Sequence, residues 1–411
     1  MSQKIDFVAA GCPNVSAPEA VQGLDLTGQI HIVTGGDGGL GKAIVEALAG
    51  AGAHVVLASH RSDKGEQMAI EISARSSGSV SFAMLDLSSL SSVRETAMAL
   101  QKLPRITSII CNAGILQSFG ATTDGFDSVF QIDYLGHAHL IRDLLPTLRR
   151  DHATVIHMSS VAGLFPCRGM ATSPSAILNF TALAVPRCLD SKPNFHLEAR
   201  PGQAGSDVHH YLFAKFMQIA HTAELARREP QLSGVYAVHP GTVREGSELL
   251  SHLPSSVDES FCASERHLMG ALSNPRQDAY WPCPALPTYG ATTAVLLAAR
   301  HGAVSSAANG ALLTNCRLAP SPIDALRTHE GAAAADAMLV RLYDWTHELL
   351  DPSPSLSPSG ITGGTGVLMT LPVWATGSMV VALALICFAV GVLTERQRNS
   401  RHYPHCELST A

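Results

Sequence analysis

Short apolar segments alternate with helical segments from about Gly28 onward, and this alternation restricts the fold more than any other feature of the chain. Six apolar segments are bounded by turn residues, as is typical of buried strands. They are 29–34, 53–59, 80–87, 106–114, 153–160 and 234–241. Helical patterns lie between them, for example at 41–52 and 133–150. Repeated strand–helix units predict an α/β fold with a doubly wound parallel sheet and right-handed crossovers.

The chain has 411 residues, of which 46% are hydrophobic, enough for one large core. We expect a single domain over residues 22–350, preceded by an N-terminal extension of residues 1–21. A linker rich in proline, serine and glycine covers 351–372, and a short polar tail covers 394–411.

Residues 373–393, VWATGSMVVALALICFAVGVL, are almost wholly apolar, and no charged residue lies between Asp351 and Glu395. At 1.5 Å per residue, a helix of this length spans roughly 30 Å, about the thickness of the hydrocarbon core of a bilayer. We therefore predict one C-terminal transmembrane helix on a flexible tether, rather than a buried core helix.

Two features of the sequence favour opposite orientations of this anchor in the membrane. Arg396, Arg398 and Arg401 follow the apolar segment, and the positive-inside rule would keep them cytoplasmic. The amino terminus lacks the basic start and apolar run of a secretory signal, which suits post-translational insertion. We expect a cytosolic domain at the endoplasmic reticulum or another organelle membrane. In the alternative, a lumenal domain, Asn14 and Asn179 would be glycosylation acceptors.

Charge and cysteine content exclude several classes of protein. The chain has 28 Lys+Arg against 34 Asp+Glu, so it has no basic field for a nucleic acid. Its nine cysteines are scattered, without a C-x-x-C pair, which indicates a reducing compartment rather than a disulfide scaffold or zinc site. We interpret His402, His405 and Cys406 as part of a polar end and expect no metal site.

A glycine-rich turn, TGGDGGLGK, follows the first expected strand and opens a helix. Such a turn lets the backbone approach a pyrophosphate, whose charge the helix N-terminus stabilises. The turn makes the fold Rossmann-type and predicts a dinucleotide site. Its expected contacts are Gly35, Gly39, Leu40 and Gly41.

The second expected strand ends with Ser59, His60 and Arg61, where NAD-selective enzymes often place a carboxylate for the ribose hydroxyls. The first carboxylate after this strand, Asp63, comes later. These side chains suit the extra phosphate of NADP better, so we expect NADP (NADPH) rather than NAD. Arg61 is equally compatible with a solvated loop.

Tyr211 and Lys215 are four residues apart, so on a helix they share one face. The spacing alone is equally typical of a core aromatic beside a solvated cation. Other motifs occur in a fixed order around the pair. They are TGGDGGLG, LDLSSLSSVR, CNAG, MSSVAG, YLFAK and HPGTV.

With this ordered set, residues 22–350 resemble the short-chain dehydrogenase/reductase family. The resemblance is closest to the branch of retinol dehydrogenases and the WW-domain oxidoreductase, although no WW domain is present. It implies that Asp86 and Leu87 contact adenine. It further implies a cofactor lining of Asn112, Ala113, Gly114, Pro240, Gly241 and Val243, the last three near the nicotinamide.

The resemblance also implies the catalytic roles. Ser160 would hydrogen-bond the substrate oxygen, with Ser159 beside it as the alternative, and Tyr211 would be the general acid or base. A free tyrosine has a pKa near 10, and a neighbouring ammonium lowers it, which gives Lys215 its physical role. Lys215 would also hold the nicotinamide ribose.

The chain departs from the family pattern at three places. Asp133 occupies the position of an asparagine that completes a catalytic tetrad, and its charge would pair with Lys215 and offset part of the effect of Lys215 on Tyr211. An insertion at about 161–210 separates Ser160 from Tyr211 and would form a lid, a membrane-dipping flap or a surface insertion. Glu245 replaces a threonine that often binds the nicotinamide amide.

We therefore expect a membrane-anchored NADP(H)-dependent oxidoreductase of lipid metabolism that interconverts an alcohol and a carbonyl. Its substrate would be a lipophilic small molecule resembling a retinoid, steroid or fatty carbonyl compound. Its partners would be this substrate and the bilayer, with a homodimer compatible with the sequence. The alternative is an NADP-binding membrane scaffold or sensor with little or no catalysis, motivated by Asp133 and Glu245.

Overall fold

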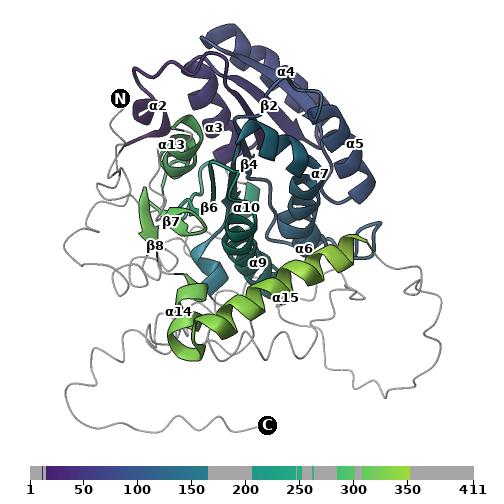
Figure 1. Cartoon of the computed structure of the whole chain (residues 1–411). Helices are drawn as coiled ribbons and strands as arrows, with labels where there is room; N and C mark the ends of the chain where they lie inside the picture. The colour runs from purple at the N-terminus through teal and green to yellow at the C-terminus, as the bar shows by residue number, and fades with distance from the viewer. Residues whose placement is uncertain are drawn as a thin grey trace, which may run out of the picture.

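Eight strands form one sheet in the order β3-β2-β1-β4-β5-β6-β7-β8, with helices on both faces (Figure 1). The computed structural model describes residues 12, 15–164, 206–246, 248–251, 262, 285–300, 308–319 and 321–351. The strands are β1 Ile30–Thr34, β2 His54–Ser59, β3 Ser79–Met84, β4 Ser108–Cys111, β5 Thr154–Met158, β6 Gly234–His239, β7 Leu312–Thr314 and β8 Arg317–Ala319.

The first six strands fall within the six predicted apolar segments, apart from a one-residue offset at the start of β3. All neighbouring pairs from β3 to β7 are parallel, which confirms the doubly wound sheet. The prediction of a wholly parallel sheet is wrong at β8, which pairs antiparallel with β7. Asn315 and Cys316 join these strands with positive φ angles of 45° and 58°, as a tight hairpin turn requires. Two three-residue strands are too short to leave an alternating pattern in the sequence.

Helices cover both faces because alternate residues of each strand face opposite sides. Val33 of β1 packs in a core with α3 and α13, whereas Ile32 packs in a second core with α5 and α7. A third cluster joins α9 to α14 and α15. The helices are α2 Ala17–Ala20, α3 Gly39–Gly50, α4 Ser62–Arg75, α5 Leu90–Leu100, α6 Ser128–Phe130, the π-helix η1 Gln131–Leu135, α7 Gly136–Asp151, the 3₁₀-helix η2 Val161–Leu164, α9 Ser206–Arg228, α10 Glu248–Ser251, α12 Pro287–Gly290, α13 Thr292–Ala299, α14 Pro322–Glu330 and α15 Ala332–Leu350.

Several sequence predictions concern segments outside the described residues. They are most of the 161–210 insertion, the linker 351–372, the apolar segment 373–393 and the tail 394–411, apart from Asp351. Within the part of the chain that the structure describes, no helix is both long and apolar enough to cross a bilayer. Part of the N-terminal extension is described, and its Cys12, Ala17 and Val21 belong to the core around α3 and α13.

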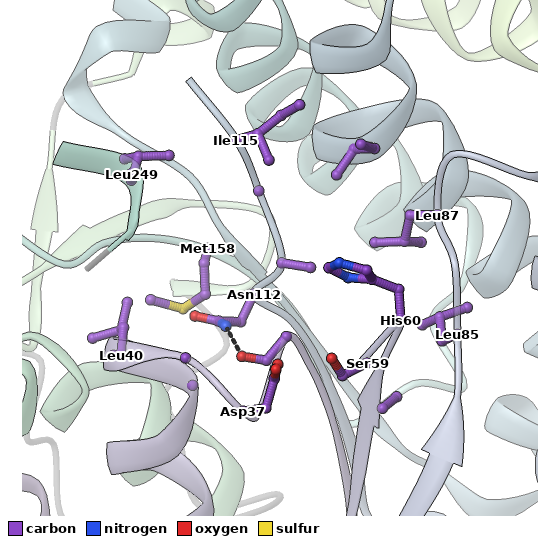
Figure 2. Close-up of a pocket in the computed structure, with 18 of the residues that line it drawn as sticks. Asp37, Leu40, Ser59, His60, Leu85, Leu87, Asn112, Ile115, Met158 and Leu249 are labelled. Carbon is purple, nitrogen blue, oxygen red and sulfur yellow. Dashed lines mark hydrogen bonds between the residues drawn. The ribbon is translucent and has the colours of Figure 1, made fainter. Parts of the chain in front are cut away.

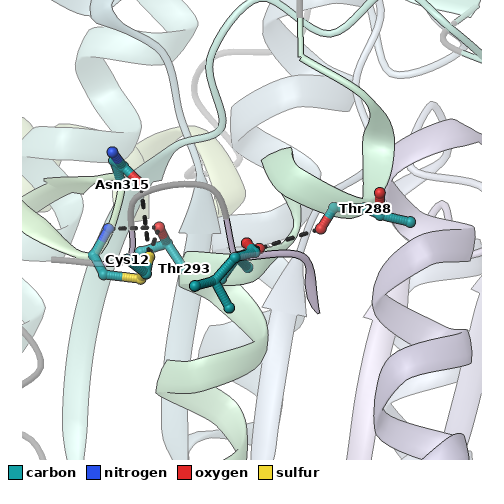
Figure 3. The surroundings of a disulfide bond; sticks show 7 residues. Cys12, Thr288, Thr293 and Asn315 are labelled. Atoms are coloured by element: carbon teal, nitrogen blue, oxygen red, sulfur yellow. Dashed lines mark hydrogen bonds between the residues drawn. A yellow bond between two sulfur atoms is a disulfide. The ribbon is translucent and has the colours of Figure 1, made fainter. Parts of the chain in front are cut away.

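A disulfide joins Cys12 to Cys316 in the β7–β8 turn, across a sequence separation of 304 residues (Figure 3). The backbone amide of Cys12 donates to the carbonyl of Asn315 (3.3 Å), and the amide of Cys316 donates to Thr293 Oγ1 (2.9 Å). The prediction of reduced cysteines without disulfides is therefore wrong for this pair. Only the fold brings together two residues so far apart in the sequence, so their spacing gave no signal.

Candidate active site

One pocket runs along the carboxyl ends of β1, β2, β4 and β5, where parallel sheets commonly bind ligands (Figure 2). Fourteen of the predicted site residues line it. They are Gly35, Gly39, Leu40, Gly41, His60, Arg61, Asp86, Leu87, Asn112, Ala113, Gly114, Tyr211, Lys215 and Pro240. The fold thus gathers most of the predicted cofactor site into one cavity, from the glycine turn to α9.

The glycine turn between β1 and α3 is packed so tightly that it excludes side chains. Gly35 has a φ of 61°, and a Cβ at Gly41 would lie 2.1 Å from the Gly35 carbonyl oxygen. Asn112 Nδ2 supports the turn by donating to the carbonyl oxygens of Thr34 (2.9 Å) and Gly35 (3.3 Å). The result is a bare backbone surface at a helix N-terminus, which fits the pyrophosphate of a dinucleotide.

Asp37 lies within this turn and lines the pocket, although it was not among the predicted site residues. Its side chain is 2% exposed, and Arg61 Nε donates to Asp37 Oδ2 at 2.6 Å. Burial alone would raise the pKa of Asp37, but hydrogen bonds from Arg61 and Ser59 and the charges of Arg61 and Lys64 hold it below its ordinary value. The sequence feature that could have identified this residue is the presence of a charged side chain between the glycines of TGGDGGLG.

Tyr211 and Lys215 lie one turn apart on α9, and the ammonium is 5.2 Å from the centre of the Tyr211 ring. Lys215 is 4% exposed. Its Nζ donates to the Met158 carbonyl (3.1 Å) and lies 3.2 Å from Asp133 Oδ2. The predicted pairing of Asp133 with Lys215 is therefore present, as a buried ion pair in which Lys215 lines the pocket and Asp133 does not.

A π-helical turn, η1, presents Asp133 to Lys215. Single π-turns in helices are frequent at functional sites. Asp133 Oδ1 also accepts from the amide of Ile115 (2.7 Å), and a Cβ at Gly114 would lie 2.9 Å from Asp133 Oδ2. The absence of a side chain at Gly114 thus leaves space for the Asp133 carboxylate. Through its bond to Ile115, this carboxylate connects the η1 turn to the pocket-lining segment that follows β4.

The three ionisable groups shift one another's pKa values. Burial raises the pKa of Tyr211, the Lys215 ammonium opposes this rise, and the Asp133 carboxylate adds to it, so the pKa lies above its ordinary value. Burial lowers the pKa of Lys215, but Asp133 and Tyr211 more than reverse that effect. Burial also keeps the pKa of Asp133 above its ordinary value despite Lys215. The charge of Asp133 therefore works against ionisation of Tyr211.

Of the two serines at the end of β5, Ser160 makes a hydrogen bond with Tyr211. Ser159 Oγ instead donates to the backbone carbonyl of Lys215 (2.8 Å), and Ser159 is 3% exposed. Ser160 is thus the hydroxyl beside the phenol, whereas Ser159 anchors α9 to the strand.

Three residues of the segment after β6 do not line the pocket: Gly241, Val243 and Glu245. Val243 is buried and forms a β-bridge with Ala285, and Glu245 is exposed. Among the described residues that follow β6, Pro240 and Leu249 line the pocket.

Comparisons with known proteins agree with this architecture. The short chain dehydrogenase family profile matches residues 29–182. The chain is 32% identical over 348 residues to Dehydrogenase/reductase SDR family member 13 of Bos taurus, covering 83% of this chain and 78% of that protein. The chain belongs to the short-chain dehydrogenase/reductase family.

Two further relatives place the chain near the branch expected from its motifs. Retinol dehydrogenase 11 of Homo sapiens is 32% identical over 235 residues (56% of this chain, 65% of that protein). The WW domain-containing oxidoreductase of Danio rerio is 34% identical over 237 residues (56% and 53%). Among solved structures, the Pseudomonas aeruginosa RhlG/NADP active-site complex is 24% identical, with a TM-score of 0.48, covering 71% of this chain and 96% of that one.

Proposed function

We propose that this protein is an NADP(H)-dependent oxidoreductase that interconverts an alcohol and a carbonyl on a lipophilic small molecule. The observation that carries the proposal is that Tyr211 and Lys215 line a pocket that also contains the glycine turn, and that Ser160 hydrogen-bonds to Tyr211. Relatives named as retinol dehydrogenases and oxidoreductases support this class of reaction.

In this mechanism the residues of the chain hold the substrate oxygen and move its proton. Bound NADP(H) would supply or accept the hydride. Ser160 donates a hydrogen bond to the carbonyl oxygen, and Tyr211 gives that oxygen its phenolic proton during reduction or removes it during oxidation. Lys215 stabilises the phenolate left behind, so the proton transfer costs less near neutral pH.

The test is NADPH oxidation by the full-length protein in detergent, against a panel of lipophilic aldehydes and ketones. We expect turnover with at least one compound, measured as loss of NADPH fluorescence and as formation of the alcohol. NADPH binding without turnover across the panel would instead favour a dinucleotide-binding scaffold or sensor. The buried Asp133–Lys215 pair supports that second candidate, because Asp133 raises the pKa of the proposed acid–base group.

Replacing Asp133 with asparagine should speed alcohol oxidation by roughly threefold or more near neutral pH, because general-base efficiency depends on the pKa of the base. The carboxylate raises the pKa of Tyr211, so its removal lowers that pKa and moves the rising limb of the pH–rate profile toward lower pH. The measurement is kcat against pH for both proteins. An unchanged or slower enzyme with the same profile would contradict this role of Asp133.

We further propose that residues 373–393 anchor the protein in a membrane, where an apolar substrate would be concentrated. The Cys12–Cys316 disulfide favours a domain on the lumenal side over the cytosolic side expected above, because disulfides persist in oxidising compartments. The tail arginines agree with that side.

Two measurements on cell membranes test this topology. The protein should stay with the membrane after alkaline carbonate extraction, whereas a chain ending at residue 372 should be released. Glycosidase should reduce the mass of the full-length protein, and the change should disappear when Asn14 and Asn179 are both replaced with glutamine. The cytosolic side would be indicated instead if the protein carries no glycan and if protease added to intact organelles digests the domain.

A further inference from the structure

The glycine turn holds a buried carboxylate, Asp37, that pairs with residues from the end of β2 and the start of α4. Asp37 Oδ2 lies 2.6 Å from Arg61 Nε and 3.9 Å from Lys64 Nζ. Ser59, the last residue of β2, also hydrogen-bonds to Asp37. Asp37 and Ser59 face the same part of the pocket (Figure 2). One carboxylate thus organises the polar groups at this end of the site.

This end of the pocket is where Rossmann-type sites distinguish the two nicotinamide dinucleotides. A carboxylate here accepts hydrogen bonds from the ribose hydroxyls of NAD, whereas an arginine accommodates the 2′-phosphate of NADP. The chain supplies both groups, already bound to each other. The carboxylate comes from the glycine turn, rather than from the end of β2 where sequence patterns usually place it.

The position of Arg61 means that its pairing with Asp37 would affect ligand binding. Its guanidinium extends over the glycine turn, where a Cβ at Gly38 would lie 3.8 Å from Arg61 Nη2. The Arg61 side chain is 30% exposed, so it can reach a ligand, but its Nε is directed at Asp37. A 2′-phosphate must therefore share Arg61 with a carboxylate of the same sign of charge, whose own side chain is only 2% exposed.

We propose that Asp37 is a specificity-determining residue that competes with the 2′-phosphate for Arg61, so that the site accepts NAD as well as NADP. The inference rests on the proposed dinucleotide function and deepens it. Asp37 weakens the NADP preference in two ways. It repels the phosphate, and it offers the ribose hydroxyls of NAD an acceptor.

The test uses two small probes, 2′,5′-ADP and 5′-AMP, which differ in the 2′-phosphate and require no turnover. Titration calorimetry on the full-length protein gives a dissociation constant for each. In the wild type, the two constants should lie within roughly tenfold of each other, because Asp37 offsets the charge-assisted bonds of Arg61. Asp37→Asn should increase the preference for 2′,5′-ADP by roughly tenfold or more, because it keeps the shape of the side chain and removes its charge.

Asp63→Asn is the matched control. It removes the same charge two residues after Arg61, from an exposed side chain that does not line the pocket, and it should leave the ratio unchanged. Asp37→Ser provides a second variant in case Asp37→Asn does not fold, as judged by circular dichroism. It should shift the ratio in the same direction.

The outcomes separate this inference from the function on which it rests. An unchanged ratio in folded Asp37 variants would overturn the role of Asp37 while leaving dinucleotide binding intact. A wild-type preference for 2′,5′-ADP above roughly a thousandfold would also overturn it, because Arg61 would then bind the phosphate unopposed. If neither probe binds the wild type, both the inference and the proposed cofactor site fail.

Discussion

Replacing Tyr211 with phenylalanine should lower kcat for carbonyl reduction by roughly a thousandfold, within the range that a positioned general acid contributes. The phenol is the acidic group beside Ser160, and phenylalanine fills the same space without a proton to give. NADPH affinity should change little, because Lys215 keeps its contacts with Met158 and Asp133. The measurements are single-turnover kinetics and NADPH titration.

Tyr134→Phe is the matched control for this experiment. Tyr134 lies on η1, is fully buried and hydrogen-bonds Thr346 Oγ1 through its hydroxyl (2.7 Å), away from the pocket lining. Its loss should cost some stability but leave kcat nearly unchanged. Full activity in Tyr211→Phe would exclude the proposed mechanism, and an equal loss in both variants would indicate a structural effect.

Replacing Lys215 with methionine should abolish turnover and also lower the free energy of unfolding by roughly 3–5 kcal/mol, since it leaves a buried charge without its partner. Asp133 has no exposed surface and accepts one backbone hydrogen bond, from Ile115. Its pKa is already above the ordinary value and should rise further without the ammonium. The stability deficit should therefore be largest at high pH and shrink as falling pH protonates the carboxyl group.

The double variant Lys215→Met with Asp133→Asn separates stability from catalysis. Removing both charges should recover most of the lost stability while turnover stays absent, because Tyr211 no longer has a neighbouring cation. Urea unfolding at two pH values measures the first effect, and Lys102→Met, an exposed lysine, is the control. A double variant as unstable as the single one would mean that the ion pair is not the source of the deficit.

The sequence predicted the parts of the molecule that depend on local pattern. Buried parallel strands are continuous apolar runs, so β1 to β6 could be found from the sequence. Their carboxyl ends meet at one edge of the sheet, and Arg61 and Asn112, which follow β2 and β4, therefore converge there as expected. The effect of the Asp133 charge could be predicted from the identity of the residue together with the neighbour, Lys215, that the family resemblance implies.

The remaining features depend on contacts between distant segments. The π-turn that directs Asp133 toward Lys215 has no period of its own in the sequence. The role of Asp37 appears only once β2 lies beside β1 and brings Arg61 over the glycine turn. Gly241 and Val243, which were expected near the nicotinamide, do not line the pocket, and Val243 forms a β-bridge with Ala285, more than 40 residues further along the chain.

The disulfide between Cys12 and Cys316 turns most of the domain into a covalent ring. The ring contains β1 to β7 together with Asp133, Tyr211 and Lys215, whereas β8 begins immediately outside it. A single protease cut anywhere inside the ring would leave the two pieces joined, so the nicked protein would migrate as two fragments only after reduction. A cut enzyme could therefore keep both halves of its active site on one molecule.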